Sequence, residues 1–449
     1  MAALLAGALA VALTAGSAVA PSQARPTSTA KSPVSAVLGI SYKTKGGTLA
    51  WFDPLTLQTL RGRKVPLQGH TGSWAFSADR LLLAIGNCDE RAFPSIRFVN
   101  ARSMRAVGDL RMSPGGDCVS ALTWLRPRRL LAVVSSMNSS DTAIVVVDPV
   151  ARRVVRRTQI ASSDDETVWS GSVATRDELV LLLGTYDSFV PARLAVVDPE
   201  GNVRVVTVER VLVGTVFDEE SEDDRRARTI YPGFAGDPES RRAFLVPASG
   251  ALAEVDLQTL SVSYRELERP SLLRRFLRWL EPAAEAKAIE GPMREARWLG
   301  EGMLAVSGTD YAIQRDAKGD ETVVGTPMGV TLVDTRSWRA RMLSPGSSGF
   351  AVAPGLVIAQ GGRWDAEAQR TVGPGILAFG LDGLERWRLS QPAGGELAPA
   401  GNLGLGHLWL RENRTQVVDL ATGSALRTIK RDERQNPWPR LLAAQSSDW

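Results

Sequence analysis

Short apolar runs and turn residues alternate along almost the whole chain. In one recurring pattern, about four apolar or β-branched residues lead into an aspartate or a substitute, then a short turn and another β-prone run. A continuous apolar run is typical of a strand buried on both faces, and aspartate accepts hydrogen bonds from backbone N–H groups two residues further on. Each copy therefore predicts a β-hairpin. The turn positions are Asp53, Asn100, Asp148, Asp198, Asp256, Asp334, Gly380 and Asp419.

A second apolar hairpin lies between successive copies of the first. These hairpins begin at Ser73, Ser120, Ser170, Gly233, Glu295, Gly349 and Ala398. Two hairpins that together recur roughly every 50 residues fit the four-stranded blade of a β-propeller. With strands lettered A to D outward from the axis, the second hairpin gives A and B and the aspartate hairpin gives C and D. The sequence thus predicts seven complete blades.

The two ends of the chain supply the remaining strands. Residues Ala36–Tyr42 lead into the first aspartate hairpin; together they give strands B, C and D of a blade that lacks a strand A. Near the other end of the chain, Trp438–Gln445 is strand-like. Two arrangements stay open: eight blades, the last closed by strands from both ends, or seven blades with a loose N-terminal hairpin. The predicted class is all-β, a propeller of about eight four-stranded antiparallel blades over residues 34–445, with one short inserted helix.

Two segments carry a family resemblance. The V-V-D-P element at Val146–Val154, repeated from Val196, resembles the YVTN-type repeat. Gly380–Leu389 is similar to a quinoprotein (PQQ-type) repeat, with Trp387 at the place of a docking tryptophan. The resemblance to these repeat propellers, which share a WD40-like architecture, covers about residues 36–445. It implies a blade and does not specify an activity.

The N-terminus predicts export. The first 20 residues are uncharged, small and apolar, and they end in Ala18-Val19-Ala20, with a second cleavage pattern at Ser22-Gln23-Ala24. We expect a signal peptide over residues 1–24, a linker over 25–33, and a secreted or extracytoplasmic protein at the cell surface or in the periplasm. An uncleaved N-terminal anchor is the alternative.

The amino-acid composition indicates which class of partner is not favoured. Hydrophobic residues make up 44% of the chain and charged residues 23%, which suits a large packed core. The net charge is +4, and basic and acidic residues are mixed along the chain, so nothing favours a nucleic-acid partner.

Loop length indicates a working face. The A–B turns are tight, whereas the long insertions fall in B–C or D–A loops, at residues 212–232, 266–294, 308–328 and 361–374. Because binding residues are often on loops held by a rigid scaffold, we expect the B–C/D–A face to bind the ligand. The candidate residues on this face are His70, Asp89, Tyr186, Asp187, Asp310, Tyr311, Trp364 and Asp365. The acidic ones either ring the channel mouth, where they would bind a cation or polar ligand, or each cap their own loop.

Two further features have two interpretations each. Cys88 and Cys118 are the only cysteines; they fall at one blade boundary on one face, which favours a disulfide over two buried thiols in an oxidising compartment. Residues Ser271–Glu281 have apolar side chains at helical spacing and arginines on another face. Such a helix either contacts a membrane or partner, or packs over its own domain.

Catalytic motifs are sparse. The chain has two histidines and no H-x-H, H-E-x-x-H or G-x-S-x-G pattern, and His407 lies inside a strand, where we expect a structural role. The first hypothesis is therefore a non-catalytic, monomeric propeller that binds a protein, glycan or cell-surface component. The second is a propeller enzyme, quinone-dependent or lyase-like, with acidic residues at the channel mouth. No cofactor or metal site is predicted; PQQ or calcium belongs to the second hypothesis.

Overall fold

A computed structural model describes fourteen segments of the chain, all within the compact unit Ser35–Trp449. The described segments are residues 36–43, 46–88, 94–112, 117–136, 141–161, 167–185, 188–218, 226–267, 291–315, 321–365, 370–390, 395–410, 414–430 and 440–442. Apart from a 3₁₀ turn, η3 (Gly401–Leu403), the regular secondary structure in these segments is β-strand, and turns and irregular stretches connect the strands. No helix in these segments is long and apolar enough to cross a membrane.

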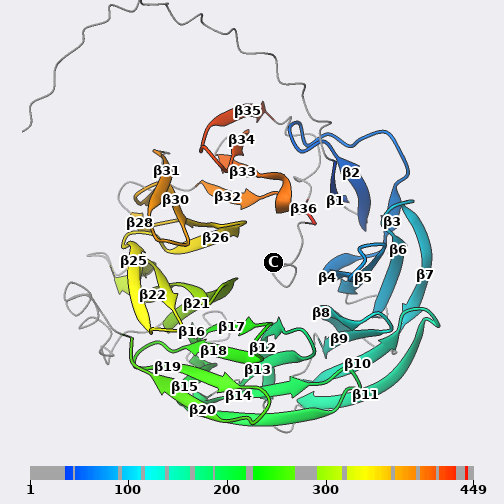
Figure 1. Cartoon of the computed structure of the whole chain (residues 1–449), viewed down its shortest axis with the longest axis horizontal. Helices are drawn as coiled ribbons and strands as arrows, with labels where there is room; N and C mark the ends of the chain where they lie inside the picture. The colour runs from blue at the N-terminus through cyan, green and yellow to red at the C-terminus, as the bar shows by residue number, and fades with distance from the viewer. Residues whose placement is uncertain are drawn as a thin grey trace, which may run out of the picture. The chain divides into compact units, whose positions relative to one another are not determined.

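Counted over the described residues, the strands pair into eight antiparallel four-strand groups placed around a ring (Figure 1). We call these groups blades 1 to 8 in chain order and list their strands from the axis outward. Blade 1 holds β36 (Arg440–Leu441), β1 (Val37–Lys43), β2 (Gly46–Phe52) and β3 (Val65–Leu67). Blade 2 holds β4 (His70–Phe76), β5 (Leu82–Cys88), β6 (Ser95–Asn100) and β7 (Arg105–Arg111). Blade 3 holds β8 (Asp117–Arg126), β9 (Arg129–Ser136), β10 (Thr142–Asp148) and β11 (Arg153–Ala161). Blade 4 holds β12 (Thr167–Ala174), β13 (Leu179–Thr185), β14 (Val190–Val197) and β15 (Val203–Asp218).

The second half of the chain repeats this order. Blade 5 holds β17 (Gly233–Asp237), β18 (Arg242–Val246), β19 (Leu252–Asp256) and β20 (Val262–Arg265). Blade 6 holds β21 (Gly291–Gly300), β22 (Met303–Arg315), β24 (Val330–Asp334) and β25 (Arg339–Ser344). Blade 7 holds β26 (Gly349–Ala353), β27 (Leu356–Gln360), β30 (Ile376–Gly380) and β31 (Glu385–Leu389). Blade 8 holds β32 (Glu396–Pro399), β33 (Leu405–Leu410), β34 (Arg414–Asp419) and β35 (Ala425–Lys430).

Strands from both ends of the chain meet in blade 1. β36 pairs antiparallel with β1, with Gly39 opposite Leu441 and Ile40 opposite Arg440. The strand expected near the C-terminus is thus the inner strand that was missing from the blade formed by the N-terminal segment. These pairings favour eight blades over seven with a loose hairpin.

The aspartate turns form as the repeat predicts. The Oδ1 atom of Asp148 accepts hydrogen bonds from the N–H groups of Val150 and Ala151, each at 2.9 Å, and Asp53, Asp256 and Asp419 do the same in their own turns. Burial matches too, because β10 is buried at every position before its terminal aspartate. The apolar core lies between neighbouring blades, where side chains of two adjacent sheets interlock.

Three of the expected insertions contain strands. β15 continues to Asp218 and pairs with β16 (Arg226–Ile230), so part of the loop expected over residues 212–232 is a hairpin. β23 (Glu321–Pro327) pairs antiparallel with the second half of β22, and β28 (Arg363–Asp365) pairs with β29 (Arg370–Val372). The periodicity of these segments had not distinguished loop from strand, because each is short and interrupted by polar residues.

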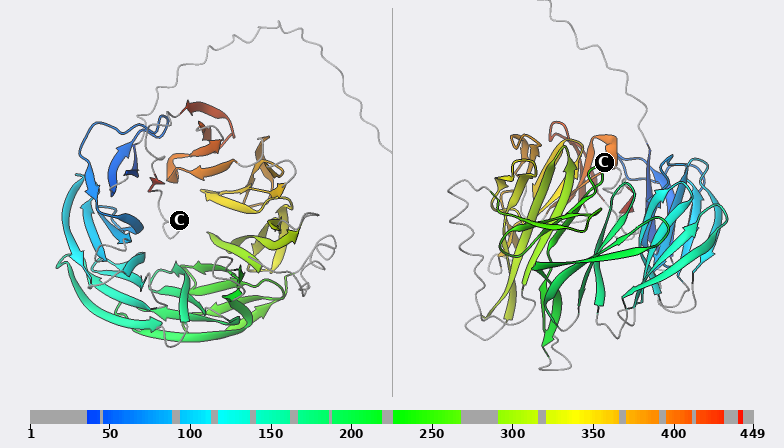
Figure 2. Two further views of the ribbon diagram at one scale, coloured as in Figure 1. Left: turned by 180° about the vertical axis from the view of Figure 1, so that it is seen from behind. Right: turned by 60° about the horizontal axis from the view of Figure 1, so that its bottom comes forward.

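The two views of Figure 2 show the ring from behind and tilted.

Several predictions concern residues outside the described segments. They are the signal peptide over 1–24, the linker over 25–33, and the helix over Ser271–Glu281 within the expected insertion 266–294.

Candidate functional site

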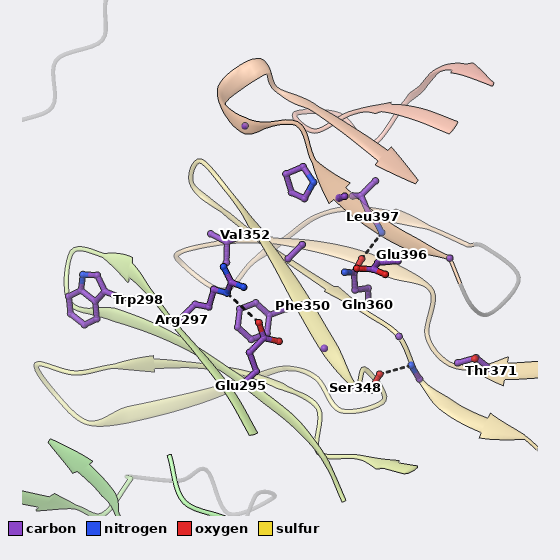
Figure 3. Close-up of a pocket in the computed structure, with 18 residues that line it drawn as sticks. Glu295, Arg297, Trp298, Ser348, Phe350, Val352, Gln360, Thr371, Glu396 and Leu397 are labelled. Atoms are coloured by element: carbon purple, nitrogen blue, oxygen red, sulfur yellow. Dashed lines mark hydrogen bonds and ion pairs between the residues drawn. The ribbon is translucent and has the colours of Figure 1, made fainter. Parts of the chain in front are cut away.

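A cavity lies along the inner strands of blades 6, 7 and 8. Its volume is ≈ 660 Å³, and its wall comes from β21, β26 and β32, with residues of β27 and β29 at one end (Figure 3). That end includes Ser348, Thr371 and Gly395, which lie in or beside the B–C and D–A connections. The cavity therefore joins the channel wall to the face on which the insertions lie.

The cavity has a charged pair at its wall. Glu295 and Arg297 both line it, and the Nε atom of Arg297 lies 3.3 Å from Oε1 of Glu295. The two residues are two apart on β21, so their side chains leave the same face of the strand. Both side chains are about half exposed, at 42% and 47%. Partial burial raises the pKa of the Glu295 carboxyl, and the adjacent guanidinium opposes that shift.

Sequence reasoning did not select this pair, although a signal for it exists. Arg294, Glu295 and Arg297 lie in the interior of an inner strand, whereas β4, β8, β12, β17 and β26 have no charged residue at interior positions. β21 therefore carries charged residues where those inner strands of other blades carry none, which indicates that the channel wall is charged at this place. Aligning the A strands of the repeat would have found it.

Hydrogen bonds between chain segments hold the wall. The Oε1 atom of Gln360 accepts a hydrogen bond of 2.8 Å from the N–H of Leu397, which joins blade 7 to blade 8. The N–H of Gly362 donates to Oγ of Ser348 at 3.1 Å and fixes the start of the β28–β29 segment against β26. Gly361 has φ 78° and an added Cβ would meet Ser348, so this close approach requires glycine. The cavity is thus largely pre-formed.

The wall offers mixed chemistry. Besides the charged pair, its lining includes the carboxylate of Glu396, the hydroxyl of Thr371 and the apolar side chains of Phe350 and Val352. Such a lining suits a polar ligand or a segment of a macromolecule that carries both charged and apolar groups.

Asp310 has an ion-pair partner and does not line the cavity. Its Oδ1 lies 2.6 Å from Nη1 of Arg294, whose side chain is 1% exposed, and Arg294 also donates to the carbonyl oxygen of Ala248 at 3.2 Å. Burial lowers the pKa of Arg294, and the carboxylate of Asp310 offsets this effect. Asp310 therefore neutralises a buried arginine between blades 5 and 6. Tyr311 is half-buried beside Gly325.

The other predicted candidates are dispersed. His70 is exposed at the start of β4, with its ring 6.4 Å from that of Tyr42. Trp364 and Asp365 belong to β28, where Trp364 is the register partner of the cavity residue Thr371. Asp89, Tyr186 and Asp187 lie outside the described segments. Within those segments, no group of three His, Cys, Asp or Glu residues is placed to hold a metal ion.

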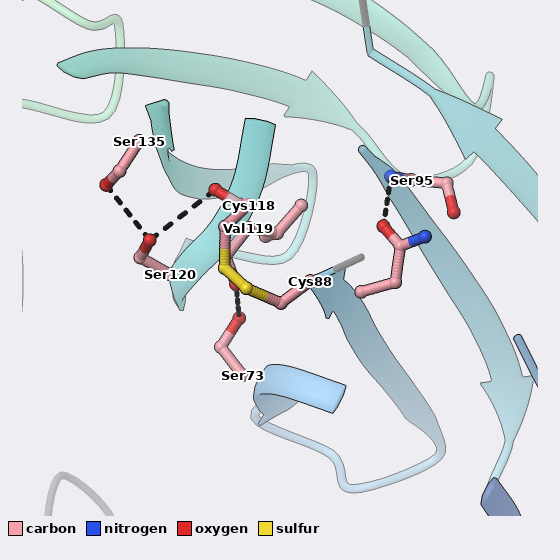
Figure 4. Close-up of a disulfide and its surroundings, with 8 residues drawn as sticks. Ser73, Cys88, Ser95, Cys118, Val119, Ser120 and Ser135 are labelled. Atoms are coloured by element: carbon pink, nitrogen blue, oxygen red, sulfur yellow. Dashed lines mark hydrogen bonds between the residues drawn. A yellow bond between two sulfur atoms is a disulfide. The ribbon is translucent and has the colours of Figure 1, made fainter. Parts of the chain in front are cut away.

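Cys88 and Cys118 form a disulfide, as predicted (Figure 4). It joins the end of β5, the second strand of blade 2, to β8, the inner strand of blade 3, with Cα atoms 4.2 Å apart. Beside it, Oγ of Ser73 donates to the carbonyl oxygen of Val119 at 2.8 Å. An added Cβ at Gly72 would lie 2.6 Å from that same oxygen, so the strands pack tightly here.

Comparison with known proteins identifies the fold. No family model matches the chain, and no curated protein matches it. Among solved structures, dihydro-heme d1 dehydrogenase NirN, in complex with DHE, is similar with a TM-score of 0.51 and 11% sequence identity, over 90% of this chain and 74% of that one. The chain is a β-propeller protein. Apo AztD from Citrobacter koseri matches with a TM-score of 0.47 and 11% identity, over 89% and 96% of the two chains. Sqt1 from Chaetomium thermophilum, bound to the N-terminus of the ribosomal protein L10, matches with 0.43 and 13%, over 81% and 88%. These likenesses concern the fold alone.

Proposed function

We propose that the chain is a secreted, non-catalytic propeller of the YVTN/PQQ repeat type that binds a protein, glycan or cell-surface component through its B–C/D–A face. The cavity along β21, β26 and β32 carries this proposal. It lies where the β28–β29 insertion meets the channel, and it combines the Glu295–Arg297 pair with hydroxyl and apolar groups. Preformed concave sites with a few placed polar groups are typical of binding proteins.

Export is supported by two observations. Cys88 and Cys118 are joined, and disulfides persist mainly in oxidising compartments. The uncharged apolar N-terminus ends in Ala18-Val19-Ala20. Mass spectrometry of the protein recovered outside the cytoplasm should find an N-terminus at Pro21 or Arg25. An intact Met1 in that fraction would overturn the cleaved signal peptide.

The binding proposal is tested by reversing the charged pair. Wild-type protein and a Glu295→Arg/Arg297→Glu variant would be incubated with cell-wall and culture-supernatant fractions of the source cells. We expect the reversed pair to weaken retention of the bound component about tenfold or more, because each charge would face the wrong partner group. The control is Arg427→Glu, an exposed residue of the outer strand β35, which should bind as wild type. Equal binding by all three proteins would refute this site.

One observation favours the enzyme hypothesis as a second candidate. The raised pKa of Glu295 suits a carboxyl that exchanges protons with a substrate in the cavity. In this alternative the chain would be a lyase-like or quinone-dependent enzyme, with calcium or PQQ as cofactor. We derive no step through either cofactor; among the described residues, no group of three His, Cys, Asp or Glu residues is placed to hold a metal ion. Turnover of acidic polysaccharides or of alcohols with a quinone, lost in Glu295→Gln, would support it.

A further inference from the structure

Gln360 brings an unpartnered amide group to the cavity of blades 6 to 8. The residue is 9% exposed and belongs to the cavity lining. Its Oε1 atom accepts a hydrogen bond from the N–H of Leu397, so the amide oxygen faces β32 and the NH₂ group lies on the other side of the amide. Among the described residues, none accepts a hydrogen bond from Nε2 of Gln360. A nearly buried donor costs free energy when it lacks a partner, so this group points to a ligand with acceptor oxygens.

The cavity places a donor beside an acceptor in two places. Glu396 lines it next to Leu397, and no ion-pair partner of this carboxylate is found in the described segments. Figure 3 shows Gln360 with Glu396 at one side of the cavity and Glu295 with Arg297 at another. Arg297 bonds Glu295 through Nε, so its two Nη groups remain as donors among the described residues.

The charges around the cavity are of both signs. The ionisable residues of the lining are Glu295, Arg297 and Glu396, and the exposed Arg363 follows the lining residue Gly362. Glu295 and Arg297 already offset each other. Among the described side chains, carboxylates and guanidinium groups are thus equal in number here. The wall has no excess of one sign that would select an anion or a cation, so a neutral polar ligand fits it better.

The backbone of the wall is poorly suited to a peptide strand. Alternate residues of an antiparallel pair turn their backbone groups to the same edge, so Leu397 and Pro399 share the free edge of β32. The N–H of Leu397 is bonded to Gln360, and proline has no N–H. On β21, the N–H of Arg294 donates to the carbonyl oxygen of Tyr231 at 2.8 Å. Strand addition needs a run of free backbone groups, and two of the three wall strands have theirs engaged.

Sugars match the remaining chemistry. Each hydroxyl is both a donor and an acceptor, so neighbouring hydroxyls of one ring can bond an adjacent donor and acceptor of the protein. A sugar ring also presents C–H groups, for which the lining offers Phe350, Val352 and Pro399. The cavity volume of ≈ 660 Å³ lies within the range of about 300–1,000 Å³ that is typical of ligand pockets.

We propose that the cavity binds a neutral saccharide. Gln360 and Glu396 bond one pair of hydroxyls, Arg297 and Glu295 bond a second pair, and the apolar lining contacts the ring. This inference rests on the proposed binding function, because it names the ligand class of the same cavity.

Titration calorimetry of the full chain with soluble oligosaccharides tests the ligand class. The neutral probes are hexamers of glucose and of N-acetylglucosamine, and the charged probes are hexamers of galacturonate and of glucosamine. We expect a neutral probe to bind with a Kd below about 1 mM that changes little as salt rises, and both charged probes to bind at least about tenfold more weakly. A charged probe that binds as tightly as the neutral ones, or no binding of either neutral probe, would overturn the proposal.

Two conservative variants locate the binding. Gln360→Glu keeps an oxygen for the N–H of Leu397 but removes the NH₂ donors, and Glu396→Gln removes the carboxylate charge at nearly constant shape. Each should weaken binding of the neutral probe about tenfold. The matched controls Gln258→Glu and Glu239→Gln alter exposed turn residues of blade 5 and should bind as wild type. Thermal unfolding checks that each variant is folded, and Glu396→Gln carries the test if Gln360→Glu is not. Wild-type affinity in the folded cavity variants would contradict this site.

The component retained from cell-wall or supernatant fractions separates failure of this inference from failure of the binding function. If the wild type retains no component, the binding function fails, and this inference fails with it. If a component is retained, treating the fraction with periodate, which cleaves the vicinal diols of sugars, should abolish retention, while proteinase K should not. Retention that survives periodate but not proteinase K would replace the saccharide by a protein partner and leave the binding function standing.

Discussion

The Nε2 atom of His407 lies 2.7 Å from the carbonyl oxygen of Pro54, and the imidazole is fully buried. His407 belongs to β33 of blade 8, and Pro54 belongs to the turn after β2 of blade 1. This contact therefore joins the last blade to the first across 353 residues of sequence. It is a second closure of the ring, independent of the pairing between β36 and β1. The structural role expected for His407 has this physical basis.

His407→Phe should destabilise the protein by about 1–3 kcal/mol, because the buried carbonyl oxygen of Pro54 loses its donor. Urea unfolding followed by tryptophan fluorescence would measure the change. The comparison variant is His70→Phe, which alters an exposed residue and should remain within about 0.5 kcal/mol of wild type. Wild-type stability in His407→Phe would show that the contact does not stabilise the closure.

Stability should also depend on pH through His407. Burial lowers the pKa of this imidazole below its usual value of 6.5, so the folded state holds it neutral while the unfolded chain takes up a proton as pH falls. Its contribution is therefore present above about pH 6.5 and is lost as pH falls towards the lowered pKa. Between pH 7 and pH 5, the wild type should lose more unfolding free energy than His407→Gln does. Parallel pH profiles for the two proteins would exclude this effect.

Removing β36 should loosen blade 1. Leu442 is 5% exposed and packs with Leu38 and Ile40, and its burial contributes about 1.5–3 kcal/mol. A chain ending at Lys430 should therefore unfold at lower temperature than one ending at Leu442, which keeps the strand. If both truncated chains have the same unfolding temperature, the C-terminal strand does not close the ring.

Loss of the disulfide should lower the free energy of unfolding. Cys88 and Cys118 are 30 residues apart, and a crosslink over such a loop contributes roughly 3–4 kcal/mol by the chain-entropy model. Denaturant unfolding of wild type with and without a reductant should reveal this difference, while a Cys88→Ser/Cys118→Ser variant should be insensitive to reductant. A wild type whose unfolding ignores reductant would contradict it.

The repeat made most of the fold predictable. Apolar runs before Asp53, Asp148 and Asp256 gave the C strands, and the same aspartates close their turns through backbone N–H groups. Terminal closure was predictable because Ala36–Tyr42 lacked an A strand and a strand-like segment remained near the C-terminus. These features follow from local periodicity and turn chemistry, which a single sequence contains.

The site was less predictable. Loop length pointed to the face where the β28–β29 insertion meets the cavity, yet the residues selected there were aspartates, aromatic residues and His70. One of them, Asp310, instead pairs with the buried Arg294. Which side chains converge depends on how neighbouring inner strands pack around the axis, and a single repeat does not contain that information. The Gln360–Leu397 hydrogen bond between blades 7 and 8 is one such contact.

Site-specific photocross-linking tests the binding site most directly. A photoreactive amino acid placed at Thr371, in the cavity, would be compared with one at Thr428, on the exposed outer strand of blade 8. We expect the Thr371 protein to form an adduct with the retained partner, the adduct to disappear when Glu295 and Arg297 exchange charges, and the Thr428 protein to form none. Equal adducts at both positions, or an adduct at Thr428 alone, would contradict binding through this cavity.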